Sequence, residues 1–292
     1  MSTITKGKPS WLRRRLPSGG DYERIRRVVG GNGLNTVCQE AMCPNQFECF
    51  AKGTATFMIL GDRCSRNCRF CAVDHGPHGN PDPEEPVRVA EAITRLQLNY
   101  AVVTSVTRDD LPDGGAAHFA AVIKAIRAAG TALVEVLIPD FQGNAQALAT
   151  VLEARPDVLN HNLETVARLY PTVRPQAEYR RSLELLARVK RNSPEMVTKS
   201  GIMIGLGETA EELDQLLCDL RETGCDILTA GQYLQPSAAH LPVAEFIMPA
   251  AFTRLHTQAM TRGFGAVAAA PFVRSSYQAE DLYRQALAAR ST

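Results

Sequence analysis

The sequence predicts an α/β protein whose strands form a partial, open TIM-type (β/α)6 barrel. From about residue 55 onward, short β-rich apolar runs alternate with longer segments in which apolar residues recur every three or four positions. That alternation is typical of βα units around a parallel sheet. Six units are too few to close an eight-stranded barrel. The chain has 292 residues, of which 45% are hydrophobic, so it can build one barrel-sized core.

The six strands are expected at residues 56–60, 101–106, 133–138, 158–160, 201–204 and 227–231. Five helices are expected between them, at residues 87–98, 116–129, 145–153, 179–191 and 210–223. Gly130 and Gly224 stand where a glycine commonly ends a helix. Pro194 keeps the fourth helix from running on toward the fifth strand.

Two extensions are expected to flank the barrel at residues 55–248. The N-terminal extension is residues 1–54. The C-terminal extension, residues 249–292, is expected to hold a helix at 249–262, an apolar run at 266–270 and a final helix after Ala279. In barrels of this kind the active site lies at the carboxyl ends of the strands.

The composition argues against several classes of function. A formal net charge of +1 gives no overall reason to expect binding to nucleic acid or to a membrane. No apolar run approaches the roughly 18–20 residues of a membrane helix, and the N-terminus lacks the apolar core of a secretory signal. We therefore expect a cytoplasmic monomer. In that reducing compartment, clustered cysteines bind metals or act in catalysis more often than they form disulfides.

Residues 1–27 differ from the rest because they carry eight basic residues and two acidic ones. One interpretation is a solvated arm, and another is an electrostatic handle for an acidic partner. A third interpretation, a mitochondrial transit peptide, is disfavoured because Pro9, Pro17, Gly19 and Gly20 break any amphipathic helix.

Six of the eight cysteines form two triplets within 34 residues. The second triplet, a C-x3-C-x2-C run directly after the first strand, is Cys64, Cys68 and Cys71. The first triplet, a C-x4-C-x5-C run, is Cys38, Cys43 and Cys49. Each triplet is one ligand short of the four that an iron–sulfur cube or a closed zinc site takes. The missing ligand leaves one metal open for a substrate, or a distant residue supplies it, and two such sites favour catalysis.

The second triplet has alternative interpretations. They are a zinc site completed by His75 and His78, a disulfide pair with one spare thiol, and a coincidence of packing. A zinc site usually shows paired C-x2-C elements and a full set of four ligands. Here the triplet stands alone, with Phe70 between its last two cysteines.

The spacing of the second triplet resembles the defining motif of the radical S-adenosylmethionine superfamily. The first triplet resembles that of the lipoyl synthases within it, and so do six further segments, at residues 103–115, 135–141, 160–165, 199–208, 232–237 and 274–277. The last segment reads Arg-Ser-Ser-Tyr. The resemblance runs from about residue 30 to residue 280 and implies the partial barrel that the alternation predicts.

The resemblance implies an enzyme that inserts two sulfur atoms, at carbons 6 and 8 of an octanoyl chain amide-linked to a lysine of a carrier domain. It implies S-adenosylmethionine and two 4Fe-4S clusters as cofactors. The second triplet would hold the radical-generating cluster. The first triplet would hold an auxiliary cluster that is the sulfur source, with a serine of the pair Ser275 and Ser276 as its fourth ligand. We favour Ser276.

Eight further residues are expected near S-adenosylmethionine on the strength of this resemblance. Thr104, Ser105, Arg108 and Asp110 would bind its polar groups, Glu135 and Asn162 its ribose or methionine portion, Arg174 its carboxylate, and Phe70 would lie beside it in the cysteine loop. Each of these residues except Phe70 has an alternative role in satisfying local backbone groups.

The implied partners are octanoylated lipoyl-carrier domains, namely 2-oxoacid dehydrogenase E2 subunits and the glycine cleavage H protein. A low-potential electron donor and an iron–sulfur carrier that rebuilds the auxiliary cluster are implied as well. One competing function is another sulfur-inserting radical S-adenosylmethionine enzyme with an auxiliary cluster. A non-catalytic zinc or redox-sensing scaffold is a competing function of a different class.

Overall fold

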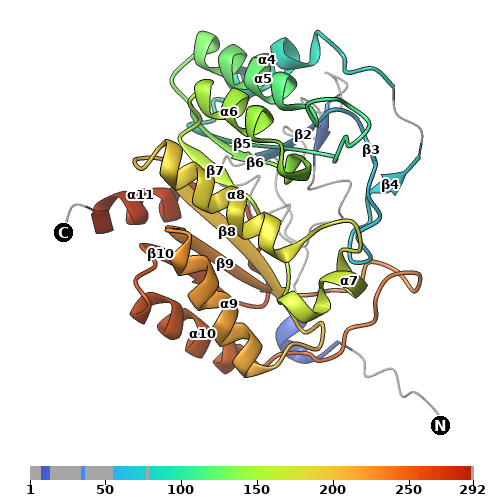
Figure 1. The fold of residues 1–292 in the computed structure, drawn as a ribbon, viewed down its shortest axis with the longest axis vertical. Coiled ribbons are helices and arrows are strands. Elements are labelled where there is room, and N and C mark those ends of the chain that lie inside the picture. Colours follow the sequence, from blue (N-terminus) through green and yellow to red (C-terminus); the bar gives the residue numbers. More distant parts are fainter. Residues whose placement is uncertain (1–7, 14–33, 37–54, 77–78, 291–292) are drawn as a thin grey trace.

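A computed structural model describes residues 8–13, 34–36, 55–76 and 79–290. Its centre is an eight-stranded sheet in the order β1-β2-β5-β6-β7-β8-β9-β10 (Figure 1). The first two strands, β1 (Asn35–Thr36) and β2 (Ala55–Ile59), pair antiparallel, and every other neighbouring pair is parallel. The remaining strands are β5 (Tyr100–Ser105), β6 (Leu133–Leu137), β7 (Val158–Asn160), β8 (Val197–Ile204), β9 (Ile227–Gln232) and β10 (Ala266–Ala269).

The open α/β barrel predicted from the sequence is confirmed, with two differences. The fifth predicted strand, β8, begins at Val197 and so includes the polar residues Lys199 and Ser200. The apolar run near the C-terminus is a seventh parallel strand, β10, which pairs with β9. The sheet therefore continues into the region that the sequence analysis assigned to the C-terminal extension.

In the described ranges seven longer helices accompany the strands, and local sequence explains several of their ends. They are α4 (Glu85–Leu96), α5 (Ala116–Ala129), α6 (Ala145–Glu153), α8 (Tyr179–Asn192), α9 (Ala210–Glu222), α10 (Pro249–Thr261) and α11 (Ala279–Arg290). The Asn144 side chain caps α6 by accepting hydrogen bonds from two backbone amides. Thr209 and Glu212 form a capping box at the start of α9. Gly130 ends α5, as expected.

The two faces of the sheet have different covers. One face packs against α4, α5, α6, α8, α9 and α10 and contributes to the larger hydrophobic core (Figure 1). On the other face, α11 packs Ala279, Leu282 and Ala286 against the amino-terminal residues of several strands. Tyr100 of β5 meets Tyr283 of α11 there, with ring centroids 6.2 Å apart. The final helix thus closes the amino-terminal end of the barrel and leaves the carboxyl end for a site.

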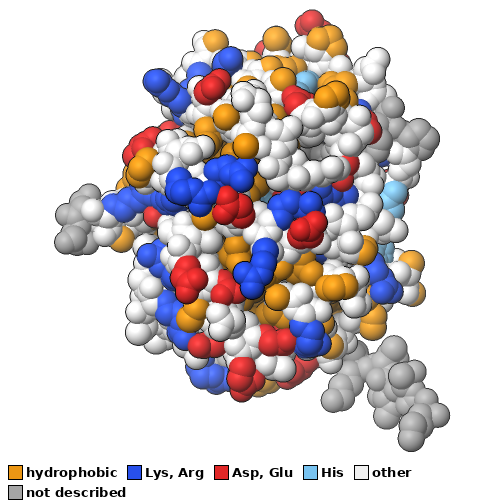
Figure 2. Space-filling view, viewed as in Figure 1, with side chains coloured by type: hydrophobic (Ala, Val, Ile, Leu, Met, Phe, Trp, Pro, Cys, Tyr) orange, Lys and Arg blue, Asp and Glu red, His pale blue; other side chains and the backbone are white. Residues whose placement is uncertain are grey.

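Short elements complete the described chain. They are the 3-10 turns η1 (Ser10–Leu12), η2 (Phe141–Gly143) and η3 (Ala167–Leu169), the helix α7 (Tyr170–Val173), and the two-stranded ladder of β3 (Arg63–Cys64) and β4 (Asp74–His75). On the face with the helices, basic and acidic side chains are interleaved (Figure 2). For example, Arg188 and Arg191 of α8 both pair with Glu184.

None of the helices in the described ranges is both long enough and apolar enough to cross a bilayer.

Candidate functional site

The carboxyl ends of the parallel strands surround a cavity of about 580 Å³. Its lining includes the loop after β2, the ends of β5 and β7, and the C-terminal residues 273–277. Lys8 also lines the cavity, from residues 8–13, the part of the basic arm that the structure describes. The cavity is at the end of the barrel where the sequence analysis expected the active site.

The loop after β2 brings its three cysteines to this cavity. Cys64, Cys68 and Cys71 all line it and are partly buried. Burial raises the pKa of the Cys71 thiol to about 12. Burial also raises the pKa of the Cys68 thiol, although the positive charge of Arg174 opposes that rise. The Cys68 and Cys71 thiols therefore hold their protons more tightly than a free thiol does, and a bound metal would have to displace those protons.

A zinc site and an iron–sulfur cube require different arrangements of three thiol ligands. Within the described ranges, no three His, Cys, Asp or Glu side chains lie close enough together to hold a single metal ion. His75 lines the cavity, whereas His78 lies outside the described residues. A zinc ion gathers its ligands around one centre, whereas a cube takes each thiolate on a separate iron and spreads them apart. The donor set fits a cube with one open iron.

The C-terminal Arg-Ser-Ser-Tyr segment, residues 274–277, is far from the cysteine loop in sequence but lines the same cavity. Ser275 and Ser276 both line the cavity. A Cβ atom placed on Gly231 of β9 would stand 2.0 Å from the carbonyl oxygen of Val273, so the segment approaches the strand closely only because that residue is glycine. Cys38, Cys43 and Cys49, the other expected ligands of the auxiliary cluster, lie outside the described residues.

Several predicted cofactor contacts do line the cavity. They are Phe70, Thr104, Ser105, Asn162 and Arg174. The Thr104 hydroxyl is already engaged, because it donates to the carbonyl oxygen of Leu137. Three of the other polar atoms, Ser105 Oγ, Asn162 Oδ1 and Arg174 Nε, are buried and have no hydrogen-bond partner in the described chain.

These three orphaned atoms make a chemical test of the expected cofactor. A buried polar atom without a partner costs free energy, so such atoms in a cavity indicate a polar ligand. One guanidinium donor, one amide acceptor and one hydroxyl match a ligand that carries a carboxylate and hydroxyl or amino groups. S-adenosylmethionine has all of these groups, so the residues fit it.

Three of the predicted contacts do not line the cavity. The Arg108 guanidinium binds the carboxylate of Asp110, with a closest distance of 2.8 Å, and also donates to the carbonyl oxygens of Leu60 and Gly79. Neither Arg108 nor Asp110 lines the cavity. The loop after β5 turns this pair back onto the chain near the end of β2, so the ion pair holds the loop in place.

Glu135 is the third of these residues. Its side chain is fully buried in the middle of β6, and both of its oxygens bind the Lys199 ammonium, at 2.9 and 3.1 Å. Tyr100 and Asn160 donate to the same carboxylate. Glu135 stands two residues before the end of β6 and therefore lies below the cavity. Its negative charge is the partner of the positive charge of the buried Lys199.

Two residues that the sequence analysis left without a role also line the cavity. Glu164 has a left-handed backbone (φ 66°) and accepts a hydrogen bond from Asn162, and burial raises its pKa. Burial and then the charge of Arg174 lower the pKa of His161 to about 4, so this residue is neutral. Both residues lie in the segment 160–165, which is one of the segments that resemble the lipoyl synthases. Their closeness to Asn162 in the sequence was the signal that could have identified them.

Solved structures share this fold at low sequence identity. Streptococcus suis SuiB bound to S-adenosylmethionine matches with a TM-score of 0.58 at 11% identity, over 77% of this chain and 54% of that chain. Methylornithine synthase matches with a TM-score of 0.53 at 13% identity, over 85% of this chain and 76% of that chain. These similarities concern the fold alone.

Sequence comparison identifies the family to which the chain belongs. Residues 58–220 match the Radical SAM superfamily. The lipoyl synthase of Desulfotalea psychrophila is 63% identical over 285 residues, which is 97% of this chain and 95% of that protein. The lipoyl synthase of Alkaliphilus metalliredigens is 54% identical over 277 residues, which is 94% of this chain and 96% of that protein. This chain belongs to the lipoyl synthase family of the radical S-adenosylmethionine superfamily.

Proposed function

We propose that this enzyme inserts sulfur at carbons 6 and 8 of an octanoyl chain carried on a protein lysine. The observation that carries the proposal is one cavity that brings together the cysteine loop, three orphaned polar atoms and the Ser275-Ser276 pair. When bound, two 4Fe-4S clusters and S-adenosylmethionine supply the radical chemistry and the sulfur.

The cysteine loop holds the radical-generating cluster in this proposal. Cys64, Cys68 and Cys71 provide three thiolates, which leaves one iron of a cube open. Arg174 is in reach of Cys68, whose thiol pKa its charge lowers. A carboxylate on the unpartnered Nε of Arg174 would therefore lie beside the cluster.

Ser105 and Asn162 offer the other unpartnered atoms to the same ligand. Phe70 adds an apolar wall, and Thr104 supports the β6 backbone.

Ser276 serves as the fourth ligand of the auxiliary cluster, together with Cys38, Cys43 and Cys49. The hydrogen bonds of the neighbouring serine support this choice. Ser275 Oγ already receives a 2.7 Å hydrogen bond from Asn162. A hydroxyl oxygen is a harder donor than a thiolate and matches the iron of such a cluster less well, so Ser276 would be the most easily released of the four ligands.

The substrate in this proposal is an octanoylated lipoyl-carrier domain, as in 2-oxoacid dehydrogenase E2 subunits and the glycine cleavage H protein. A low-potential donor supplies electrons, and an iron–sulfur carrier restores the auxiliary cluster. Among the described residues of the basic arm, 8–13, Lys8 lines the cavity. Its position is compatible with an arm that receives the carrier at the cavity mouth.

An anaerobic assay tests the proposal. The reconstituted chain is incubated with reductant, S-adenosylmethionine and an octanoyl-lysine carrier peptide, and the product is weighed. We expect a peptide that has gained two sulfur atoms. C68A should form neither this product nor 5′-deoxyadenosine, and C43A should form 5′-deoxyadenosine without any C–S bond. A wild-type chain that cleaves S-adenosylmethionine but leaves the octanoyl peptide unchanged would point instead to another sulfur-inserting enzyme of the superfamily.

A further inference from the structure

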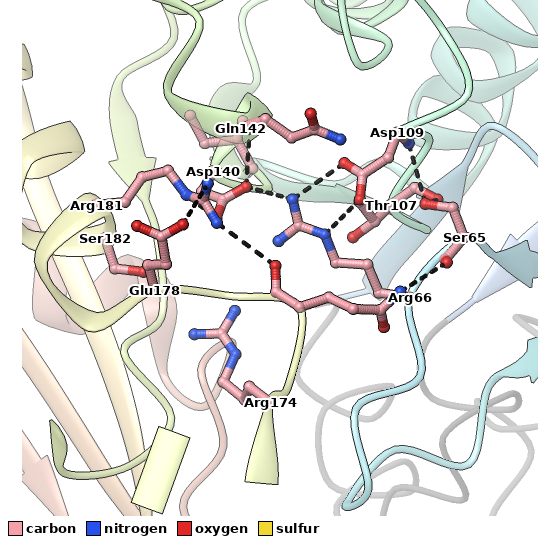
Figure 3. Close-up of polar contacts among 12 residues, drawn as sticks. Ser65, Arg66, Thr107, Asp109, Asp140, Gln142, Arg174, Glu178, Arg181 and Ser182 are labelled. Carbon is pink, nitrogen blue, oxygen red and sulfur yellow. Dashed lines mark hydrogen bonds and ion pairs between the residues drawn. The ribbon is translucent and has the colours of Figure 1, made fainter. Parts of the chain in front are cut away.

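The cysteine loop contains an arginine that is more buried than the cysteines around it. Arg66 has 4% of its surface exposed, and it lies between Cys64 and Cys68. Its guanidinium binds Asp109 through two nitrogens, at 2.6 and 3.0 Å, and Asp140 at 2.6 Å (Figure 3). Asp109 follows β5 and Asp140 follows β6, so one side chain ties the loop to the ends of two strands.

The chain of charges continues beyond Asp140. The second oxygen of this carboxylate accepts a 2.9 Å bond from Arg181 of α8 (Figure 3). Burial alone would raise the pKa of Asp140, but the hydrogen bonds and charge of Arg66 hold it well below its usual range. Two arginines and two aspartates therefore alternate from the cysteine loop to α8, and each buried charge has a partner of opposite sign.

Ser65 fixes the same part of the loop through hydrogen bonds. Its backbone amide and its hydroxyl both donate to the Thr107 carbonyl oxygen, at 2.9 Å each. Its hydroxyl also accepts from the Asp109 amide, at 3.0 Å. The hydrogen bonds of Ser65 and the Arg66–Asp109 ion pair together join the cysteine loop to the segment after β5.

This anchoring has a consequence at the first cysteine. Two backbone amides donate to Cys64 Sγ, that of Arg66 at 3.4 Å and that of Thr107 at 3.3 Å. Hydrogen bonds to the sulfurs of a cluster are among the factors that set its reduction potential. A donor stabilises the extra negative charge of the reduced form, so these two bonds raise the potential.

We propose that Arg66, through its bridge between Asp109 and Asp140, is a positioning residue that holds the amides of Arg66 and Thr107 on Cys64 and so raises the reduction potential of the radical-generating cluster. The inference rests on the proposed assignment of that cluster to Cys64, Cys68 and Cys71. No role in binding the cofactors or the substrate is needed for Arg66 itself. Without the bridge, the two amides leave the thiolate, and the cluster becomes harder to reduce.

The test uses full-length chains in which Cys38, Cys43 and Cys49 are alanine, so that one cluster gives the signal. R66M, D140N and the control R63M, which alters an exposed arginine of the same loop, are compared with that parent. The midpoint potential is measured by a redox titration followed by electron paramagnetic resonance. We expect R66M and D140N both to shift it in the negative direction and R63M to leave it near the parent value.

The two substitutions separate positioning from charge. Removing a positive charge makes reduction harder, and removing a negative charge makes it easier, if charge alone acts. Opposite shifts for R66M and D140N would therefore overturn the proposal, and so would an unchanged potential in both. Hydrogen exchange of the cluster-free chains gives a second measurement: the amides of residues 66 and 107 should exchange about tenfold faster in both variants, because local opening then costs less.

Equal exchange rates in all four cluster-free chains would overturn the proposal even if a variant fails to take up iron. Failure of the underlying assignment has a different signature. If C64A in the same parent retained the full iron and sulfide content of the radical cluster, then the cluster would not be held by this loop, whatever R66M does.

Discussion

The side-chain amide of Asn162 donates a 2.7 Å hydrogen bond to the hydroxyl of Ser275, a residue 113 positions later in the chain. This bond links the residues after β7 to the C-terminal segment that carries Ser276, the proposed ligand of the auxiliary cluster. It also distinguishes the two neighbouring serines, because it engages the hydroxyl of Ser275, and for this reason we propose Ser276 as the ligand.

The first prediction separates these serines. S276A should lose iron and sulfide from the auxiliary cluster, since one of its four ligands is gone, whereas S275A should retain both. The measurement is iron and sulfide per chain after anaerobic reconstitution, with C43A as the reference for loss of the auxiliary cluster. Loss of iron in S275A together with full retention in S276A would reverse the assignment.

The second prediction concerns Arg174. R174K keeps the positive charge but lacks the planar fork that can bind a carboxylate through two nitrogens. We expect it to weaken S-adenosylmethionine binding by roughly 1.5–3 kcal/mol, the range for a hydrogen bond between charged groups. Equilibrium binding to chains of equal iron content measures this loss. R168K, a change in an exposed arginine that pairs with Glu212, is the matched control and should bind like the wild type. Equal affinities for all three would contradict the role of Arg174.

The third prediction concerns stability and the ion pair beneath the cavity. Lys199 and Glu135 are both fully buried, so K199M leaves a buried carboxylate without its charge partner. Such a change costs about 3–5 kcal/mol of unfolding free energy. The double variant K199M/E135Q should recover part of the loss, because the neutral glutamine removes the unpaired charge and its carbonyl oxygen can still accept from Asn160.

Chemical denaturation of the cluster-free chain measures the effect of the ion pair. R188M, which breaks the more exposed pair with Glu184, should cost at most about 1 kcal/mol. The account of the barrel interior would be wrong if K199M cost no more than this control.

The fourth prediction is a pH dependence from His161. Burial, followed by the charge of Arg174, lowers its pKa from 6.5 to about 4. Below pH 6.5 the unfolded chain therefore binds a proton that the folded chain rejects. The contribution of the neutral His161 side chain to the free energy of unfolding is therefore complete above pH 6.5 and is lost as the pH falls toward 4. The other charged groups acting on this ring are Asp140 and Arg66.

The variant H161Q removes this titration. Between pH 6.5 and pH 4 the wild-type chain should lose on the order of 3 kcal/mol more unfolding free energy than H161Q, because the pKa of His161 is about 4 in the folded chain and 6.5 in the unfolded chain. Denaturation curves of both cluster-free chains across this range measure the difference. Parallel losses in the two chains would show that His161 does not titrate as its burial requires.

The fold could be predicted from the sequence wherever a periodic pattern was uninterrupted. The strand β8 was predicted to start late because Lys199 and Ser200 break its apolar run, and only the distant Glu135 makes a buried lysine acceptable there. The strand β10 was recognised as apolar but not as a strand, because three of its four residues are alanine, which has a low β-propensity.

The site could be predicted where a residue stands at the carboxyl end of a strand. Ser105 ends β5 and Asn162 follows β7 by two residues, and both reach the cavity. Arg108 and Asp110 do not, because they bind each other and the loop folds back. Nothing local in the sequence indicates that ion pair, and the same holds for the Asn162–Ser275 bond, which depends on two distant segments meeting.

The most direct test of the central claim, that this one chain supplies the inserted sulfur from its own auxiliary cluster, is an isotope measurement in a single turnover. The clusters are built with heavy-isotope sulfide, the excess sulfide is removed, and the lipoyl product on an octanoyl-lysine peptide is weighed. We expect that both sulfur atoms of the product carry the label and that C43A yields no product. A product with unlabelled sulfur, formed while the auxiliary cluster stays intact, would contradict it.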